Sequence, residues 1–246
     1  LFKTSYASVV KASNGEVLAG RIAVDGQWRF PLEDSIPNKF EACILQFEDE
    51  YFYHHFGVNP ISIAKALYQN LQQGKVKRGG STLTMQIARL QQKNASRTYW
   101  QKFKEVMIAL RLEMEFSKQE ILNLYASHAP FGGNVVGLES ASRRYFGVSP
   151  SKLSWAQMAT LAVLPNRPGL IYPGRGQIEL RRKRNFLLRK LSERGFLDSL
   201  QLDLALTVDL PQKPYPLSQK GKHLLNYLVA KKGEGKVFNT TINADL

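Results

Sequence analysis

The stretch from Pro37 to Gly57 constrains the fold of this chain most. Its first part carries large apolar residues at the spacing of one helical face, namely Phe40, Ile44, Phe47 and Tyr51. This periodicity predicts an amphipathic helix over about residues 36–52, because positions three, four and seven apart share a face of an α-helix. Pro37 suits the first turn of such a helix. We therefore expect Glu48, one step off this stripe, to lie near the end of a buried helix.

The end of this predicted helix carries several polar groups. Residues 48–57 contain three carboxylates and two histidines between aromatic rings, and Gly57 closes the stretch. Glu48, Phe52 and His55 would share one face if the helix continued that far. A carboxylate on the edge of an apolar helix, just before a glycine turn, is well placed to line a cleft. The alternative is a solvated acidic helix end, and this stretch alone leaves both open.

Composition sets broad limits on what the chain can bind. Its 246 residues suffice for one large domain, or for one domain with further pieces, and 43% of them are hydrophobic, so a substantial core can form. The net charge of +14 indicates an anionic partner: nucleic acid, an acidic membrane surface or a phosphorylated substrate. The single cysteine, Cys43, excludes an internal disulfide and is expected to be buried. One cysteine and four histidines offer no zinc-binding spacing.

The rest of the chain is predicted to be helical after a short β segment. Asn14-Gly15, between two apolar pairs, predicts a hairpin within residues 1–33. Caps, glycines and prolines delimit further helices over about residues 60–74, 82–91, 97–116, 117–127, 135–146, 154–165, 177–194, 198–207 and 223–231. The basic run at residues 181–184 is expected to be a solvated helix face that could meet phospholipid. Residues 237–242 are predicted to form a lone strand whose partners are missing.

Two glycines precede the helix predicted to begin near residue 82. Gly79 and Gly80 lack side chains, so the backbone there can approach a ligand closely. Ser81 and Thr82 can cap the helix, whose N-terminal amide groups favour an anion. The motif alone is a weak indication, because many Gly-Gly-Ser stretches are only turns.

The helix predicted over residues 97–116 has two partly apolar faces. One stripe recurs at alternating spacings of three and four residues, which predicts that it packs on the core. This stripe consists of Trp100, Phe103, Met107, Leu110 and Met114. Glu105 lies on nearly the opposite side, so we expect its carboxylate to be at least partly buried and to need a partner or a function. Lys102 could be that partner, and the pair could equally be a structural ion pair.

Together these stretches resemble the family 51 glycosyltransferases, the peptidoglycan transglycosylase domain of class A penicillin-binding proteins. The resemblance covers about residues 37–173, with the family's motifs in consistent order. The matching stretches are Glu48-Asp49-x-x-Phe52-x-x-His55-x-Gly57, Gly79 through Gln86, Arg97 through Glu113, Lys118 through Tyr125, and Gly137 through Gly147. Within the family, the chain is most similar to the 1C branch. Gln101 departs from the pattern, because the family usually has arginine beside the lysine of the third motif.

The resemblance implies a mainly α, lysozyme-like, bilobal glycosyltransferase fold with a short β N-terminal segment. It implies a β segment over residues 1–33, a transglycosylase domain over 34–210, and a linker with the truncated start of a transpeptidase domain over 211–246. Because the chain starts at Leu1 rather than methionine, we expect a piece of a longer protein whose membrane anchor lies elsewhere. The implied location is the bacterial cell envelope, at the outer face of the cytoplasmic membrane.

The resemblance also implies a reaction: lipid II is polymerised into glycan strands, with inversion at the sugar and release of undecaprenyl diphosphate. Glu48 would be the general base that takes the proton from the acceptor's 4-hydroxyl, and Glu105 would assist departure of the donor diphosphate. The implied substrate-binding residues are Asp49, His55, Gly80, Ser81, Thr82, Gln86, Arg89, Arg97 and Lys102. No cofactor is required by the sequence and no metal ligand is predicted; a divalent cation, Mg²⁺ or Mn²⁺, would sit on the substrate diphosphate.

The expected partners are lipid II, the growing glycan strand, a membrane surface and the transpeptidase domain of the same full-length chain. Nucleic acid is not expected, because the sequence contains no recognised nucleic-acid-binding motif. One alternative is a lysozyme-like glycan hydrolase, which would also use two carboxylates but needs no cations for a diphosphate. Another is an inactive relative that still binds lipid II, since Gln101 removes one cation near the diphosphate.

Overall fold

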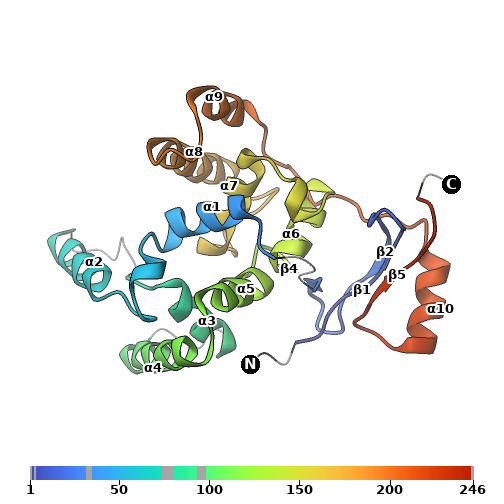
Figure 1. Cartoon of the computed structure of the whole chain (residues 1–246), viewed down its shortest axis with the longest axis horizontal. Coiled ribbons are helices and arrows are strands. Elements are labelled where there is room, and N and C mark those ends of the chain that lie inside the picture. Colours follow the sequence, from blue (N-terminus) through green and yellow to red (C-terminus); the bar gives the residue numbers. More distant parts are fainter. Residues whose placement is uncertain (1, 3, 32–34, 74–79, 93–97, 245–246) are drawn as a thin grey trace.

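The fold is mainly helical with a few short strands, as predicted (Figure 1). The computed structural model describes residues 2, 4–31, 35–73, 80–92 and 98–244. The α-helices are α1 (Asn38–Glu48), α2 (Pro60–Gln73), α3 (Leu83–Gln91), α4 (Tyr99–Glu115), α5 (Lys118–His128), α6 (Leu138–Phe146), α7 (Trp155–Val163), α8 (Gln177–Glu193), α9 (Ser199–Thr207) and α10 (Lys222–Lys232). Short 3-10 helices are η1 (Phe52–His54), η2 (Pro150–Lys152) and η3 (Leu164–Asn166). The strands are β1 (Ser8–Lys11), β2 (Val17–Arg21), β3 (Trp28–Arg29), β4 (Val135–Val136) and β5 (Val237–Asn239).

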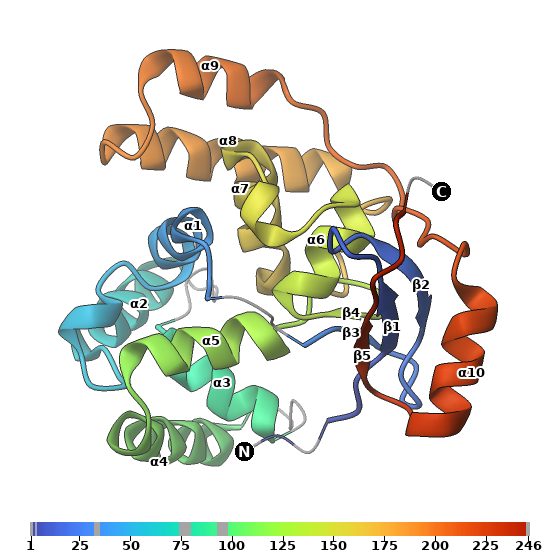
Figure 2. The same cartoon turned by 45° about the vertical axis from the view of Figure 1, so that its right-hand side comes forward.

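The main hydrophobic core is built around helix α7. Every side chain from Met158 to Val163 is buried, and a helix without a polar face must be covered on all sides. Helices α1 and α8 pack on α7, and α3 packs on α5 beside them (Figures 1 and 2). Capping boxes are formed at the start of α5 (Ser117–Glu120) and of α7 (Ser154–Gln157). Cys43 of α1 is fully buried in this core, as predicted.

A small sheet joins segments from opposite ends of the chain. Strand β1 pairs antiparallel with β2, which confirms the predicted hairpin, and β5 adds to β1 in parallel, with Val237 opposite Val9. Helix α10 packs on β1 and β2 (Figure 2). The prediction of a lone strand at residues 237–242 was therefore wrong, because β1 is its partner. The division at residues 34 and 210 stays a prediction.

Helix α1 ends earlier than its apolar pattern predicted. Its last residue is Glu48, and Asp49 leaves the helical backbone with φ −155° and ψ 72°. Phe52–His54 form the separate helix η1, so Glu48, Phe52 and His55 do not share one helix face. The aromatic residues after Glu48 continue the apolar spacing, but the backbone turns there because the Asp49 side chain bonds elsewhere, as described below.

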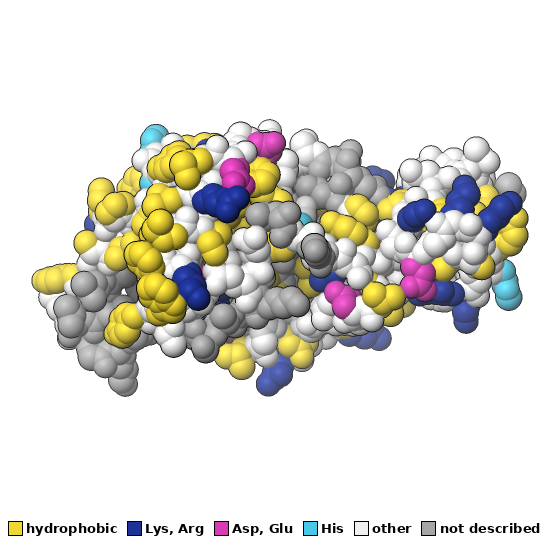
Figure 3. All heavy atoms as spheres, turned by 90° about the horizontal axis from the view of Figure 1, so that it is seen from below, with side chains coloured by type: hydrophobic (Ala, Val, Ile, Leu, Met, Phe, Trp, Pro, Cys, Tyr) yellow, Lys and Arg dark blue, Asp and Glu magenta, His cyan; other side chains and the backbone are white. Residues whose placement is uncertain are grey.

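Helix α4 presents its apolar stripe outward, against our prediction of a core stripe. Trp100, Phe103, Met107 and Met114 are 64%, 53%, 52% and 71% exposed. The buried face consists of Gln101, Glu105, Ala109 and Leu112. Ile61 and Tyr68 of α2 are also exposed, and Figure 3, which shows the α4 side of the molecule, has hydrophobic side chains gathered there. The spacing of the residues identified an apolar face of α4, but it did not determine whether that face packs on the core or is exposed.

Among the residues that the structure describes, no helix combines the length and apolar character needed to cross a bilayer.

The basic run of helix α8 is only partly solvated, which corrects a second prediction. Arg184 is fully buried, and its guanidinium donates to the carbonyl oxygens of Val208 (2.5 Å) and Leu206 (3.4 Å). These carbonyls lie at the C-terminal end of α9, where a positive charge is favourable. Arg184 shares its buried face with Leu180 and Leu187, at helical spacing.

The orientation of α4 gives the first test. Leu112→Ala should lower the free energy of unfolding by about 2–5 kcal/mol, because this side chain is only 2% exposed and its loss leaves a cavity. Met114→Ala, on the same helix, should change it by less than about 0.5 kcal/mol, because Met114 faces outward. Urea unfolding of both variants measures the difference, and equal losses would contradict the orientation.

Candidate active site

The N-terminus of helix α3 is tied to the segment that follows α1. Thr82 is the N-cap residue: its Oγ1 accepts from the Met85 amide at 3.2 Å and donates to the Gly57 carbonyl at 2.6 Å. Asp49 Oδ2 accepts from the Leu83 amide at 3.0 Å. Two side chains therefore join sequence stretches that the family resemblance treated as separate motifs.

Asp49 also receives a hydrogen bond from His55, whose Nε2 lies 2.9 Å and 3.1 Å from its two carboxylate oxygens. The side chains of this pair are only 6% (His55) and 5% (Asp49) exposed. His55 packs edge-on against the buried ring of Phe52. Asp49 and His55 thus bond to each other and to the start of α3 inside the protein, and their role in substrate binding stays a prediction.

Glu48 ends helix α1 with a partly buried carboxylate held at both oxygens. Gln86 of α3 donates Nε2 to Oε2 at 2.9 Å, and Asn166 of η3 donates Nδ2 to Oε1 at 3.2 Å. The hydroxyl of Tyr125 donates in turn to Gln86 Oε1 at 3.4 Å, which orients the amide. The carboxylate is therefore fixed from two different elements of the core.

Burial raises the pKa of the Glu48 carboxyl above its ordinary value. The hydrogen bonds from Gln86 and Asn166 and the charge of Lys183 lower this pKa in part, while the neighbouring Asp49 raises it. A carboxylate with a raised pKa is a stronger proton acceptor, since a general base works best when its pKa lies near the operating pH. The environment of Glu48 thus suits proton abstraction.

Glu105, the second predicted catalytic carboxylate, is 6% exposed and lies on the buried face of α4. Lys102 Nζ donates to Glu105 Oε2 at 3.0 Å and to Ser81 Oγ at 2.5 Å. Ser81 directly precedes the Thr82 cap of α3. Both carboxylates are therefore connected to α3, Glu48 through Gln86 and Glu105 through Lys102 and Ser81.

The first turn of α3 offers fewer free amides to an anion than the sequence suggested. The amides of Leu83 and Met85 donate to Asp49 and to Thr82, so neither is available to a ligand. The Lys102 side chain is 43% exposed and is accessible. Lys102 is therefore accessible to an anion here, whereas these two amides already have partners within the chain.

Two glycines of the motif stretches, Gly57 and Gly80, are explained by packing within the chain. A Cβ on Gly80 would lie 2.8 Å from Cα of Ile63, and one on Gly57 would lie 2.8 Å from the Ala109 carbonyl oxygen. Gly57 also has φ +73°, which disfavours other residues. The predicted ligand-binding role of Gly80 remains a prediction, because its close approach to α2 already accounts for a glycine.

Three further positions bear on the predicted cation set. Arg89 of α3 has a buried Nε without a hydrogen-bond partner among the described residues. Arg97 lies outside the described residues. Gln101, which stands where the family usually has arginine, donates Nε2 to Gln92 Oε1. No group of three or more His, Cys, Asp or Glu side chains in the described parts of the chain is placed to hold a metal ion.

Two contributors to the surroundings of Glu48 were not predicted. Asn166 follows the helix predicted over residues 154–165, and Lys183 lies in the run that was predicted to be solvated. The Lys183 ammonium donates to Asn166 Oδ1 and lies 5.9 Å from the centre of the Phe47 ring. No local periodicity carries this signal, because Lys183 reaches Asn166 only once α8 packs on α7.

A third feature that was not predicted is a partly buried ion pair next to the segment that carries His55. Glu113, whose side chain is 3% exposed, accepts from Thr84 Oγ1 at 2.7 Å and lies 2.8 Å from Lys118 Nζ. Lys118 also donates to the His55 carbonyl at 2.6 Å. These contacts join α3, α4 and α5 to the loop. Glu113 and Lys118 belong to different helices, so helical spacing could not pair them.

Comparison with known proteins gives consistent matches. A model of the family described as transglycosylase matches residues 15–192. The chain is 37% identical to penicillin-binding protein 1C of Escherichia coli (strain K12), over 100% of this chain and 32% of that protein. It is 31% identical to penicillin-binding protein 1A of Aquifex aeolicus (strain VF5), over 97% of this chain and 34% of that protein. The crystal structure of penicillin-binding protein 1A from Haemophilus influenzae matches with a TM-score of 0.49 and 17% identity, over 99% of this chain and 28% of that one.

The chain therefore spans about a third of the length of the curated relatives that it matches.

The close packing of Gly57 against α4 can be tested with a matched glycine. Gly26→Ala should cost about 1 kcal/mol of stability, because Gly26 has φ +74° but nothing within 4 Å of a Cβ. Gly57→Ala should cost about 3 kcal/mol or more, because the clash with Ala109 adds to the same backbone cost. Urea unfolding gives both values. A Gly57 variant as stable as the Gly26 variant would show that this contact is not tight.

The raised pKa of Glu48 predicts a pH-dependent stability. The folded state binds the proton more tightly than the unfolded state, so Glu48 disfavours folding progressively as pH rises above the unfolded value of about 4.3. Glu48→Gln removes this ionisation. The stability of the variant relative to the parent should therefore rise between about pH 4 and pH 7. Thermal unfolding at several pH values measures it, and a parallel pH dependence in both proteins would contradict the prediction.

Proposed function

The chain belongs to the transglycosylase family, and from this premise we propose that it is a peptidoglycan glycosyltransferase that polymerises lipid II into glycan strands. The motif resemblance to this family is thereby confirmed, whereas the reaction and its residues are our proposal. The observation that supports it most is the contact of two carboxylates with helix α3 and the residue before its N-cap: Glu48 through Gln86, and Glu105 through Lys102 and Ser81, with the accessible Lys102 ammonium bonded directly to Glu105. Such an asymmetric pair suits a base on one side and an anionic leaving group on the other.

In the proposed reaction Glu48 acts as the general base. The acceptor's 4-hydroxyl oxygen attacks the anomeric carbon of the donor, its proton passes to Glu48, and the bond from that carbon to the diphosphate oxygen breaks. A hydroxyl is a poor nucleophile, so a positioned base lowers the barrier. Attack opposite the leaving diphosphate inverts the sugar, and undecaprenyl diphosphate departs.

Lys102 and Glu105 act on the leaving-group side. The diphosphate gains negative charge as it departs, and a fixed cation stabilises that charge in a partly buried site. Lys102 is held by Glu105 and Ser81 but keeps an accessible surface. Glu105 orients the lysine in this proposal. Arg89 and Arg97 remain proposed as further cations, and we assign any Mg²⁺ or Mn²⁺ to the substrate's own diphosphate.

The outward aromatic residues of α4, with exposed residues of α2, support a proposed membrane surface as partner. A lipid-linked substrate resides in a bilayer, and aromatic side chains are favoured at its interface. We propose the outer face of the bacterial cytoplasmic membrane as the location. Because the relatives are about three times longer, a transpeptidase domain in the full-length protein is likewise proposed.

The two alternatives make different demands on the same residues. A glycan hydrolase would use two carboxylates, but it has no need of the accessible Lys102 beside Glu105. An inactive relative that binds lipid II would still need that lysine. Gln101, which stands where the family usually has arginine, donates a hydrogen bond to Gln92. The active transferase is favoured over the inactive relative because both carboxylates are present and positioned.

The proposal is tested by lipid II turnover in detergent or lipid, with product length resolved by gel electrophoresis. Glu48→Gln should lower polymer formation about 10²–10⁴-fold, as expected for the loss of a general base. Glu105→Gln should also lower it strongly, because Lys102 loses its anchor. Glu115→Gln is the matched control on α4, since Glu115 is more exposed and pairs with Arg111. Cleavage of preformed glycan by the parent, without polymer synthesis, would favour the hydrolase.

A further inference from the structure

Asn166 connects the Glu48 carboxylate to the half-buried Lys183 of helix α8. Its Nδ2 donates to Glu48 Oε1 at 3.2 Å, and its Oδ1 accepts from the Lys183 ammonium. The amide fits in this orientation alone, because a flipped side chain would set oxygen against carboxylate and NH₂ against ammonium. Lys183, Asn166 and Glu48 therefore form a directed chain from cation through amide to anion.

The elements that carry this chain belong to the main core. Asn166 ends η3, which continues directly from the buried helix α7, and Leu164 at its start is fully buried. Helix α8 packs on α7 and sets the position of Lys183, whose ammonium also lies near the ring of Phe47, next to Glu48. The carboxylate is thus held at Oε2 through Gln86 from α3 and at Oε1 through Asn166, an exposed residue at the end of η3.

The titratable groups around Glu48 come from three elements. Asp49 follows it on its own segment and opposes its negative charge, Tyr125 approaches from α5, and Lys183 approaches from α8 with the opposite sign. Lys183 in turn faces Arg167, Glu179 and Arg182. The positive charge of Lys183 thus offsets the electrostatic repulsion between the Asp49 and Glu48 carboxylates, and burial strengthens that repulsion.

We propose that Asn166 and Lys183 are positioning residues that hold the Glu48 carboxylate in the orientation and charge state in which it accepts the acceptor's proton. This inference rests on the proposed role of Glu48 as general base. Asn166 fixes the orientation and Lys183 keeps the carboxylate ionised. Asn166 and Lys183 both lie C-terminal to the motif stretches that carry the family resemblance, the last of which ends at Gly147.

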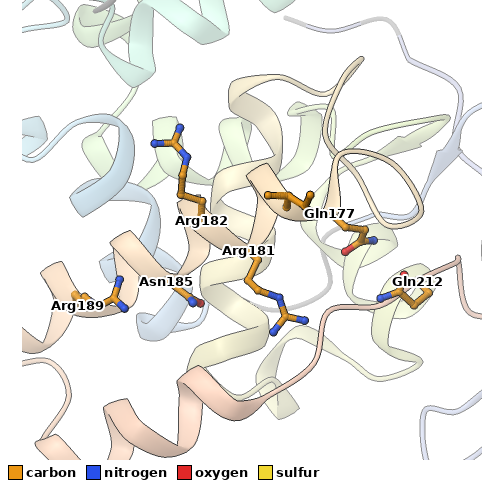
Figure 4. A pocket seen from close by; sticks show the side chains of 7 residues that line it. Gln177, Arg181, Arg182, Asn185, Arg189 and Gln212 are labelled. Carbon is orange, nitrogen blue, oxygen red and sulfur yellow. The ribbon is translucent and has the colours of Figure 1, made fainter.

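The activity test compares Asn166→Ala and Lys183→Met with a control on the same helix. Arg181→Met removes one positive charge from the outer side of α8, where Arg181 lies at a surface hollow of about 510 Å³ with Arg189 and Gln212 (Figure 4). Asn166→Ala should lower kcat for lipid II polymerisation about tenfold with little change in KM, because one hydrogen bond to the base is lost. Lys183→Met should move the acid limb of the pH–rate profile to higher pH. Lys183→Arg should restore it, and Arg181→Met should leave it unchanged.

A direct titration makes the outcome independent of turnover. The Glu48 carboxyl carbon can be followed by NMR in protein labelled with ¹³C at glutamate, with Glu48→Gln identifying its resonance. Lys183→Met should raise the pH at which this carbon titrates, while Arg181→Met should not. An unchanged titration and acid limb in folded Lys183→Met would overturn the inference even where Glu48→Gln abolishes polymer. Retained polymer synthesis in Glu48→Gln would instead overturn the proposed base, and the titration would still show whether Lys183 controls that carboxylate.

Discussion

The hydrogen bond from the Leu83 amide to Asp49 is the constraint on which the site depends. It joins the residue at which the backbone leaves α1, directly after Glu48, to the first residue of α3, whose amide it occupies with a side chain of the chain itself. Because Leu83 is buried, breaking it would leave the Leu83 amide without this partner, at a cost above that of losing an exposed contact, while Asp49 would keep its contact with His55. Glu48, Gln86 and Ser81 take their places relative to one another because this bond is made.

The parts of the fold and site that the sequence predicted are those encoded locally. A cap, a tight turn or a pair three residues apart depends on neighbouring positions alone, so the hairpin at Asn14-Gly15, the Thr82 cap and the Lys102–Glu105 pair could be found in advance. Spacing also placed Glu105 on a buried face. Roles for individual residues came instead from the family resemblance, which the motifs carried.

The features that could not be predicted depend on how helices and strands that are distant in the sequence pack against one another. An apolar stripe indicates that a helix has two sides, but Trp100 and Leu112 show that the more apolar side can be the outer one. Arg184 is buried because carbonyl groups of α9 happen to face it, and β5 finds a partner from the far end of the chain. Asn166 and Lys183 depend in the same way on the packing of α8 against α7.

Helix α4 carries Glu105 on one side and the exposed aromatic residues on the other, so its own thickness separates the two. An α-helix with its side chains measures about 10 Å across, and this width does not vary with sequence in the way that a loop's length can. In the proposed function, the width of α4 therefore sets the distance between the bilayer surface and the reactive carbon of a sugar bound to a lipid diphosphate. The length of the prenyl chain would then have little effect on the reaction, whereas the distance that the head group spans from the bilayer to the sugar would have a large effect.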